Sequence, residues 1–325
     1  MSQPQSILLQ NKQGMSVEII NFGARIKSIL FPIQGKPTEM VVGYATAEEY
    51  LTDSFYLGAT CGRVCNRIDG GKFELNGVSY QVTQNENNNT LHGGVDNFSY
   101  RFWKIESSTD TKVVLSLESK DGDQGFPGNL KLQVSYHLTE KNALEIEYFG
   151  ISDAATPINI TNHAYFNLGD ESCESLDLQL LASNFLELKE DSVPSGNILS
   201  VDNSDFDLRQ VTNIGDRQSN TTDVNLKNMK GFDYCYVLDN NDVSIVNASL
   251  ASKNNGVKMS FYTDQLAVQL YTGYWLSGVF KPYQGVCLEA QGYTNAININ
   301  HFPSSVLSEN EKYQRKIIYQ FEAIN

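Results

Sequence analysis

Residues 130–148 read LKLQVSYHLTEKNALEIEY, and this stretch decides the fold class. Apolar and polar side chains alternate over residues 130–138, and the alternation resumes over 144–148 after the polar segment 140–142. Successive side chains of a β-strand point to opposite faces of the sheet. The period of two therefore predicts an antiparallel hairpin with one buried face and one solvated face.

The rest of the chain repeats this pattern in short segments between turn residues. Asn76-Gly77 separates two short alternating runs and predicts a hairpin with a two-residue turn. We expect long loops over 184–230, which is rich in Asn, Asp and Ser, and a turn or two of helix only at 46–51 and 305–312. The prediction is an all-β chain with little helix, in which residues 1–325 form one large antiparallel domain. Its further strands lie at 113–117, 258–263, 266–272 and 316–322.

The net charge of the chain limits the classes of molecule that it is expected to bind. The formal net charge is −14 over 325 residues, and no basic run offsets it. Such a surface repels phosphate backbones and anionic lipids, so we expect a small neutral molecule as partner, and neither nucleic acid nor a membrane. The first 12 residues lack the basic and apolar regions of a signal peptide, and no segment has the length of a membrane span, which favours a cytoplasmic protein.

The cysteines point to the same compartment. Their number is odd, and their spacing matches no metal or redox pattern, so we expect free, buried thiols in a reducing environment and no bound metal. The five positions are 61, 65, 173, 235 and 287. The sequence leaves the oligomeric state open between a monomer and a homodimer.

Two of the four histidines lie in small polar clusters that a fold alone does not require. His92 precedes Gly93-Gly94, where the backbone can approach a ligand closely, and His163 has Asn162 and Tyr165 as neighbours. An imidazole gives or takes a proton near neutral pH, so both are candidates for acid/base chemistry or for ligand binding. We assign no role to the other two histidines, because His137 falls on a solvated strand face and His301 lies in a loop.

A glutamate stands inside an apolar run further along the chain. In 285–291, Glu289 shares one strand face with Cys287 and Gln291, while Val286 and Leu288 take the opposite face. Half-burial on that face raises the pKa of a carboxylate and suits a general base.

Three more side chains are candidates for holding a ligand. Arg67 lies four residues after Arg63, and the neighbouring glycines favour at least one inward guanidinium, whose fork of donors suits vicinal hydroxyls. Asp233 between two aromatic residues is typical of carbohydrate binding, although a turn aspartate is the plain alternative. Gln269 occupies a strand and has solvent exposure as its alternative.

Seven motifs, in order over nearly the whole chain, resemble those of the aldose 1-epimerases, also called galactose mutarotases. The match begins at 20–24 (INFGA) and continues through 62–68 (GRVCNRI), 91–94 (LHGG), 159–168 (NITNHAYFNL), 232–233 (FD), 268–273 (VQLYTG) and 285–291 (GVCLEAQ). The resemblance implies a β-supersandwich fold without a cofactor. It also implies an enzyme that interconverts the α- and β-anomers of hexoses such as galactose and glucose by opening and closing the ring.

The resemblance also implies roles for individual residues. Glu289 matches the base at the anomeric hydroxyl, and His163 matches the acid at the ring oxygen. The residues that match sugar-holding positions are Asn66, Arg67, His92, Asp233 and Gln269.

One departure from the family pattern concerns Thr294-Asn295, where most members have Pro-Asp. In the family this loop borders the sugar site, and we expect Thr294 to leave that rim looser and the sugar range broader.

Three other functions compete with the epimerase. A glycoside hydrolase would use Asp233 and Glu289 as its carboxylate pair, a carbohydrate-binding protein would have lost catalysis, and a sugar-phosphate epimerase would require a basic cluster.

Overall fold

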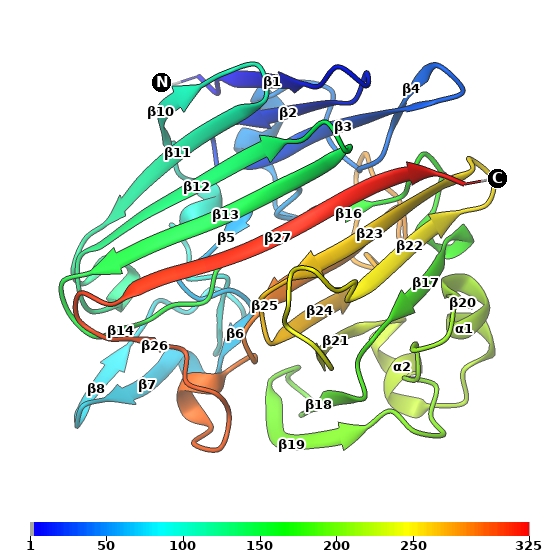
Figure 1. Ribbon diagram of the computed structural model, residues 1–325. Coiled ribbons are helices and arrows are strands. Elements are labelled where there is room, and N and C mark those ends of the chain that lie inside the picture. Colours follow the sequence, from blue (N-terminus) through cyan, green and yellow to red (C-terminus); the bar gives the residue numbers. More distant parts are fainter. Residues whose placement is uncertain (1–2, 325) are drawn as a thin grey trace.

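The computed structural model describes residues 3–324, and β-strands dominate it (Figure 1). The predicted hairpin over 130–148 is present as β12 (Leu130–Leu138) and β13 (Ala143–Ser152). Residues 130, 132, 134, 136 and 138 are buried as their alternation predicts. The all-β prediction is confirmed.

The largest sheet has nine antiparallel strands, and its centre is formed by long strands that run side by side across Figure 1. Its order is β10 (Lys104–Ser108), β11 (Lys112–Ser119), β12, β13, β27 (Lys312–Ala323), β23 (Val257–Thr263), β22 (Ala248–Ser252), β17 (Asp177–Leu180) and β20 (Thr212–Asn213). The strands predicted at 113–117, 258–263 and 316–322 are β11, β23 and β27.

A second sheet of six strands carries most of the polar motifs. Its order is β16 (Tyr165–Phe166), β25 (Val286–Gln291), β24 (Ala267–Tyr271), β21 (Asp233–Val237), β18 (Asn184–Leu188) and β19 (Pro194–Ser200). A third sheet contains β1 (Ser6–Gln10), β2 (Ser16–Ile20), β3 (Arg25–Ile33) and β4 (Lys36–Glu39).

Two-stranded pairings complete the β-structure. They are β5 (Thr60–Cys61) with β15 (Thr161–Asn162), β6 (Arg67–Ile68) with β9 (Thr90–Leu91), β7 (Lys72–Leu75) with β8 (Val78–Gln81), and β14 (Thr156–Pro157) with β26 (Val306–Leu307). The hairpin β7–β8 turns at Asn76-Gly77 as the sequence predicts.

The main hydrophobic core lies between the nine-stranded and six-stranded sheets. Val134 and Phe261 from the large sheet belong to the same buried cluster as Leu270 and Leu288 from the smaller one. Because strand residues alternate, this packing directs the neighbours of the core residues to the other face of the six-stranded sheet. On β25 those neighbours are Cys287, Glu289 and Gln291, each at most 2 % exposed.

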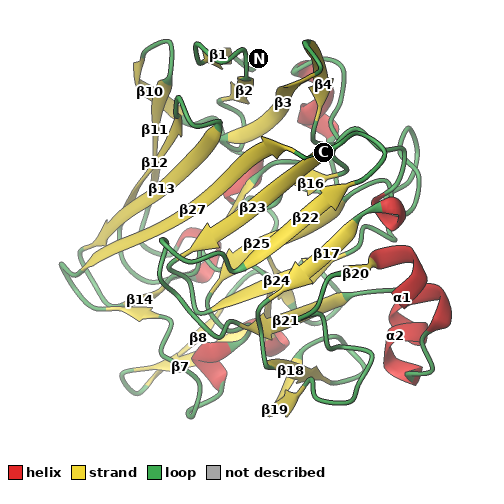
Figure 2. Ribbon diagram, turned by 45° about the vertical axis from the view of Figure 1, so that its right-hand side comes forward, coloured by secondary structure: helices red, strands yellow, loops and turns green. Residues whose placement is uncertain are grey.

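Two predictions about local structure are wrong. The segment 184–230 is not only loop: besides β18, β19 and β20 it contains α1 (Ile214–Asn220) and α2 (Val224–Met229), which lie together at one edge of the molecule (Figure 2). The segment 305–312 forms no helix and instead supplies β26. The expected turn at 46–51 is present as a 3₁₀-helix at Glu48–Thr52, and the other 3₁₀ turns are Asp69–Gly71, Phe98–Tyr100, Asp123–Gly125, Cys173–Ser175 and Ala296–Asn298.

Candidate active site

A cavity of about 230 Å³ opens on the outer face of the six-stranded sheet. Six of the seven predicted site residues line it: Asn66, Arg67, His92, His163, Asp233 and Glu289. The seventh, Gln269, lies behind the wall and donates a hydrogen bond from Nε2 to Asp233 Oδ1 at 2.6 Å. Residues separated by more than 200 positions in the sequence therefore meet at one site.

Strand register brings three of these side chains together. Gln269 on β24 pairs with Glu289 on β25 and with Cys235 on β21. Asp233 lies two residues before Cys235 on β21, so its side chain points to the same face of the sheet as that of Cys235. All three polar side chains share the face opposite to the core. The alternation inside β25 is what turns Glu289 toward the cavity.

His163 and Glu289 face each other at the base of the cavity. Nε2 of His163 lies 3.6 Å from Oε1 of Glu289, and their side chains are 6 % and 3 % exposed. Within residues 3–324, Oε2 of Glu289 has no hydrogen-bond partner. A buried carboxylate oxygen without a partner costs free energy and can accept a proton or a hydrogen bond from a ligand.

Burial shifts the pKa values of this pair in opposite directions. Burial lowers the pKa of His163 to about 4. Burial also raises the pKa of Glu289 well above its usual range; Asp233 raises it further, and the positive charge of Arg67 opposes the shift. The shifts have opposite directions, so the protonated His163 is a stronger acid and the Glu289 carboxylate a stronger base than the same groups in water.

His92 is held as a hydrogen-bond donor toward the cavity. Its Nδ1 accepts a hydrogen bond from the backbone N–H of Asn66 at 3.2 Å, and burial lowers the pKa of His92 well below its usual value. A neutral imidazole that accepts at Nδ1 carries its proton on Nε2. The next residue must be glycine, because a Cβ on Gly93 would lie 2.2 Å from the carbonyl oxygen of Gly62.

The same tautomer argues against a metal at this site. One ligand atom each from His92, His163 and Glu289 lies within 4.8 Å of the others, a donor set that zinc can use. A histidine binds a metal through the lone pair of an unprotonated ring nitrogen. In His92 the unprotonated nitrogen is Nδ1, and its lone pair already accepts the hydrogen bond from the Asn66 N–H, while Nε2 carries the proton. The residues therefore do not fit a metal ion without a rearrangement of His92.

Arg67 is fixed beside the cavity by a bidentate ion pair. Its Nε and Nη2 donate to Glu86 at 2.6 and 2.8 Å, and its Nη1 makes no hydrogen bond to residues 3–324. Arg63, the other arginine of this motif, is 1 % exposed and donates to the carbonyl oxygens of Pro127 and Gly128 away from the cavity. The expected inward guanidinium is thus present twice, once at the cavity and once in the fold.

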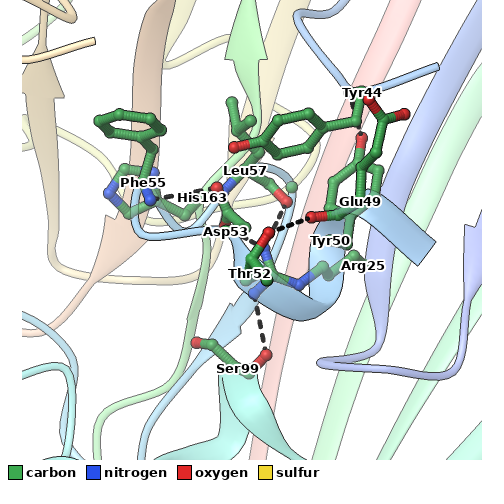
Figure 3. A network of polar contacts seen from close by, with 12 residues as sticks. Arg25, Tyr44, Glu49, Tyr50, Thr52, Asp53, Phe55, Leu57, Ser99 and His163 are labelled. Carbon is green, nitrogen blue, oxygen red and sulfur yellow. Dashed lines mark hydrogen bonds and ion pairs between the residues drawn. The ribbon is translucent and has the colours of Figure 1, made fainter. Parts of the chain in front are cut away.

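A buried ion pair fixes the segment that forms another wall of the cavity (Figure 3). Arg25 Nη1 donates to Asp53 Oδ2 at 2.6 Å, and both side chains are fully buried. Asp53 accepts hydrogen bonds from the backbone N–H groups of Phe55 and Leu57, and Arg25 donates to the carbonyl oxygens of Leu57 and Ser99.

This network continues to the backbone of His163. Gly58 follows the fixed segment, and its N–H donates to the carbonyl oxygen of His163 at 3.0 Å. Ser54, Phe55 and Tyr56 of the segment line the cavity. The Arg25–Asp53 pair therefore supports both a wall of the cavity and the position of His163.

Removing the carboxylate of this pair is expected to destabilise the fold strongly. Asp53→Ala leaves a buried, unpaired guanidinium, so the free energy of unfolding measured in urea should fall by about 3–5 kcal/mol. Asp96→Ala is the matched control, because Asp96 pairs with Arg101 at 3.1 Å but its side chain is 65 % exposed. That control should change stability by less than about 1 kcal/mol. Equal small effects in the two variants would contradict the importance of the buried pair.

Aromatic side chains that the sequence did not single out complete the cavity. Tyr165 and Tyr56 have their rings 5.0 and 5.9 Å from that of His163, Tyr271 forms a further wall, and Trp275 lies at the mouth with 66 % of its surface exposed. Tyr165 and Tyr271 lie inside the motifs at 159–168 and 268–273, which was the available signal. Tyr56 and Trp275 come from loops, whose course the strand pattern does not predict.

The expectation of a looser rim at Thr294-Asn295 is wrong. Neither residue lines the cavity, and they are only 2 % and 4 % exposed. Thr294 Oγ1 accepts a hydrogen bond from Gln291 Nε2 at 2.9 Å, and Asn295 Oδ1 accepts one from the N–H of Asp69 at 3.1 Å. Side-chain hydrogen bonds hold this turn without a proline, so the turn gives no structural reason for a broader sugar range, which stays a prediction.

Comparison with known proteins identifies the family of this chain. The family model for aldose 1-epimerase matches residues 5–320. The chain belongs to the aldose 1-epimerase family. The aldose 1-epimerase of Escherichia coli K12 is 33 % identical to it, over 99 % of this chain and 96 % of the relative. The human galactose mutarotase is also 33 % identical, over 94 % of this chain and 91 % of the relative.

Solved structures agree with the assignment to the aldose 1-epimerase family. An aldose epimerase homologue from Caenorhabditis elegans superposes with a TM-score of 0.93 at 28 % identity, over 99 % of this chain and all of that one. A galactose 1-epimerase from Lactobacillus acidophilus gives a TM-score of 0.88 at 30 % identity, over 99 % and 95 %. The sandwich of antiparallel sheets is thus the galactose mutarotase-like fold, and no helix of residues 3–324 has the length and apolarity to cross a membrane.

Proposed function

We propose that the protein is a mutarotase that interconverts the α- and β-anomers of free hexoses, galactose and glucose among them. The observation that carries the proposal is the contact of 3.6 Å between His163 Nε2 and Glu289 Oε1 at the base of the cavity. Family membership and the names of the relatives support the same activity.

The reaction needs a base at the C1 hydroxyl and an acid at the ring oxygen, the two oxygens that are bonded to the anomeric carbon. Glu289 removes the proton of the C1 hydroxyl, and the C1 oxygen forms the carbonyl double bond. The bond between C1 and the ring oxygen breaks, its electrons go to the ring oxygen, and His163 donates a proton there. Rotation about the C1–C2 bond and the reverse proton transfers close the ring as the other anomer. The pair ends with the one proton with which it began, so no cofactor is consumed.

The remaining polar side chains have the chemistry to hold the sugar. The free Nη1 of Arg67 and the Nε2–H of His92 are donors, Asp233 is an acceptor fixed by Gln269, and Asn66 lies beside them. Among the described residues that line the cavity, Arg67 is the one arginine or lysine, against the carboxylates of Glu86, Asp233 and Glu289. This balance favours a neutral sugar over a sugar phosphate.

Polarimetry on freshly dissolved α-anomers tests the proposal. We expect optical rotation of α-D-galactose and α-D-glucose to reach equilibrium faster than in buffer, at a rate proportional to protein concentration. Rates equal to those in buffer for every aldose would favour a binding protein. Release of nitrophenol from nitrophenyl glycosides would instead favour a hydrolase that uses Asp233 and Glu289.

Removal of the Arg67 side chain should act mainly on sugar binding. Arg67→Ala loses a charged hydrogen bond, so KM should rise by about tenfold or more while kcat changes less. Arg209→Ala is the control, because Arg209 pairs with Asp202 and Asp207 on the surface. A fall in kcat at unchanged KM would contradict a binding role for Arg67.

We further propose that residues 1–325 act as a single domain in the cytoplasm, as a monomer or homodimer. The family match over 5–320 and a core shared by three sheets support one domain. All five cysteines are free and buried, which supports a reducing compartment. In denaturant, five thiols per chain should react with a thiol reagent before any reduction; fewer than five would indicate a disulfide and contradict the cytoplasmic assignment.

A further inference from the structure

A second cavity, away from the candidate active site, is lined by residues of the β18–β19 hairpin, the segment 201–208 and α2. Figure 1 shows β18, β19 and α2 near one another. Its volume is about 630 Å³, against about 230 Å³ for the first cavity. Cavities that bind small molecules span roughly 300–1,000 Å³. The second cavity therefore has room for a larger ligand than the one hexose of the proposed reaction.

A largely buried tyrosine points its hydroxyl into this second cavity. Tyr234 is 3 % exposed, and its hydroxyl makes no hydrogen bond to any of residues 3–324. Tyr234 follows Asp233 on β21, so the two side chains point to opposite faces of the sheet and line different cavities. No group in the described part of the chain uses this hydroxyl, so it is available as a hydrogen-bond donor and acceptor to a ligand in the second cavity.

Further polar groups around Tyr234 border the cavity: Asp223 is half-buried, and Asn225 and Asn228 are exposed. Asp223 Oδ1 accepts hydrogen bonds from the N–H groups of Asn225 and Leu226 at the start of α2, which fixes the carboxylate and leaves Oδ2 available. Asn225 and Asn228 also line the cavity, and their side-chain amides make no hydrogen bonds within residues 3–324. Amides and a carboxylate together offer the donors and acceptors that vicinal hydroxyl groups need.

Charge and apolar surface narrow the class of ligand. The cavity has three carboxylates, Glu187, Glu190 and Asp223, whereas the ammonium of Lys189 is held by Asp69 at 2.8 Å. This excess of negative charge disfavours phosphates and other anions. The apolar part of the floor is formed by Phe185 and Phe206, whose rings stack at 4.1 Å. A sugar ring has apolar C–H groups and polar hydroxyl groups, which the apolar floor and the polar rim of the cavity can contact respectively.

We propose that this second cavity is a separate carbohydrate-binding site that takes a short neutral oligosaccharide. Tyr234, Asp223 and Asn228 bind its hydroxyl groups, and the phenylalanine floor contacts its C–H surface. The site has no histidine and does not perform the ring-opening reaction. It goes beyond the proposed activity, because it holds a sugar without transforming it.

A titration of the full-length, ¹⁵N-labelled protein tests the proposal. The probes are maltotriose and maltotriitol, of which the second has no anomeric centre at its reduced end and offers nothing to open. We expect saturable shifts of backbone amide signals in β18 and α2 with both probes. Tyr234→Phe should weaken this binding by at least about fivefold, which corresponds to the loss of one hydrogen bond.

Matched variants separate this cavity from the other sites. Tyr262→Phe removes a hydroxyl on β23 that bonds to Gln320, and Arg67→Ala alters only the first cavity. Both should leave the shifts in β18 and α2 unchanged. The proposal is overturned if neither probe gives saturable shifts there, if Tyr234→Phe binds as the unaltered protein does, if Arg67→Ala abolishes the binding, or if glucose 6-phosphate binds as tightly as maltotriose.

Discussion

Glu289→Gln is expected to lower kcat for mutarotation by about 10²–10⁴-fold, the usual contribution of one proton-transfer group. The substitution keeps the shape of the side chain and its capacity for hydrogen bonding but removes its basicity. Glu289 is 2 % exposed inside β25, and burial raises its pKa, so the carboxylate is a stronger base than one in water. KM should change by no more than about threefold, because the hydroxyl-binding residues are untouched.

Polarimetry with α-D-galactose over a range of concentrations gives kcat and KM for this variant. Glu145→Gln is the control, since Glu145 pairs with Lys316 on the large sheet, and it should behave as the unaltered protein does. Thermal unfolding of both variants checks the fold. If Glu289→Gln keeps more than about a tenth of kcat, a loss below about 1.4 kcal/mol, Glu289 is not the base.

His163→Asn is expected to lower kcat by a similar factor, about 10²-fold or more, because the ring oxygen then leaves without a proton. The imidazole is buried between Tyr56 and Tyr165, so its loss also removes packing, and thermal unfolding is measured alongside the rate. The loss of activity should exceed what a lower stability accounts for at a temperature where the variant stays folded.

His137→Asn is the control for the histidine variant. The side chain of His137 is 42 % exposed and lies 3.9 Å from Glu145 on the large sheet. Its replacement should leave kcat and KM unchanged. Comparable activity of His163→Asn and His137→Asn would contradict the assignment of His163 as the acid.

The sequence predicted the parts of the fold that depend on a strict period. Strands β12 and β13 alternate over residues 130–138 and 144–148, and their burial follows the pattern. The same argument on β25 predicted that Glu289 and Leu288 face opposite ways, and the core cluster contains Leu288 while the cavity contains Glu289. Period-two burial is a local property, so it can be read without the tertiary structure.

The sequence did not predict the short helices, because they have too few residues to show a helical period of apolar side chains. Helices α1 and α2 contain seven and six residues and bury one side chain each, Ile214 and Leu226. Their N-caps Asn213 and Asp223, whose side chains accept backbone hydrogen bonds, were the signal that could have revealed them.

The candidate site was predicted in its polar residues and missed in its aromatic and supporting ones. Glu86, which fixes Arg67, and the Arg25–Asp53 pair act through tertiary contacts between segments 19 to 28 residues apart. Charged residues of this kind are normally read as surface, and their burial depends on how the loops close over the sheet. The same limit explains the error at Thr294, whose hydrogen bond to Gln291 replaces the stiffness of a proline.

The central claim is that Glu289 and His163 act as one acid/base pair on the same step, and a double-variant cycle tests it most directly. Polarimetric kcat values are compared for the unaltered protein, Glu289→Gln, His163→Asn and the double variant. The account predicts that the double variant is about as slow as the slower single variant, because loss of either group already disables the step. Losses that multiply, so that the double variant is slower by the product of the two single factors, would mean that the two side chains act independently and would contradict the claim.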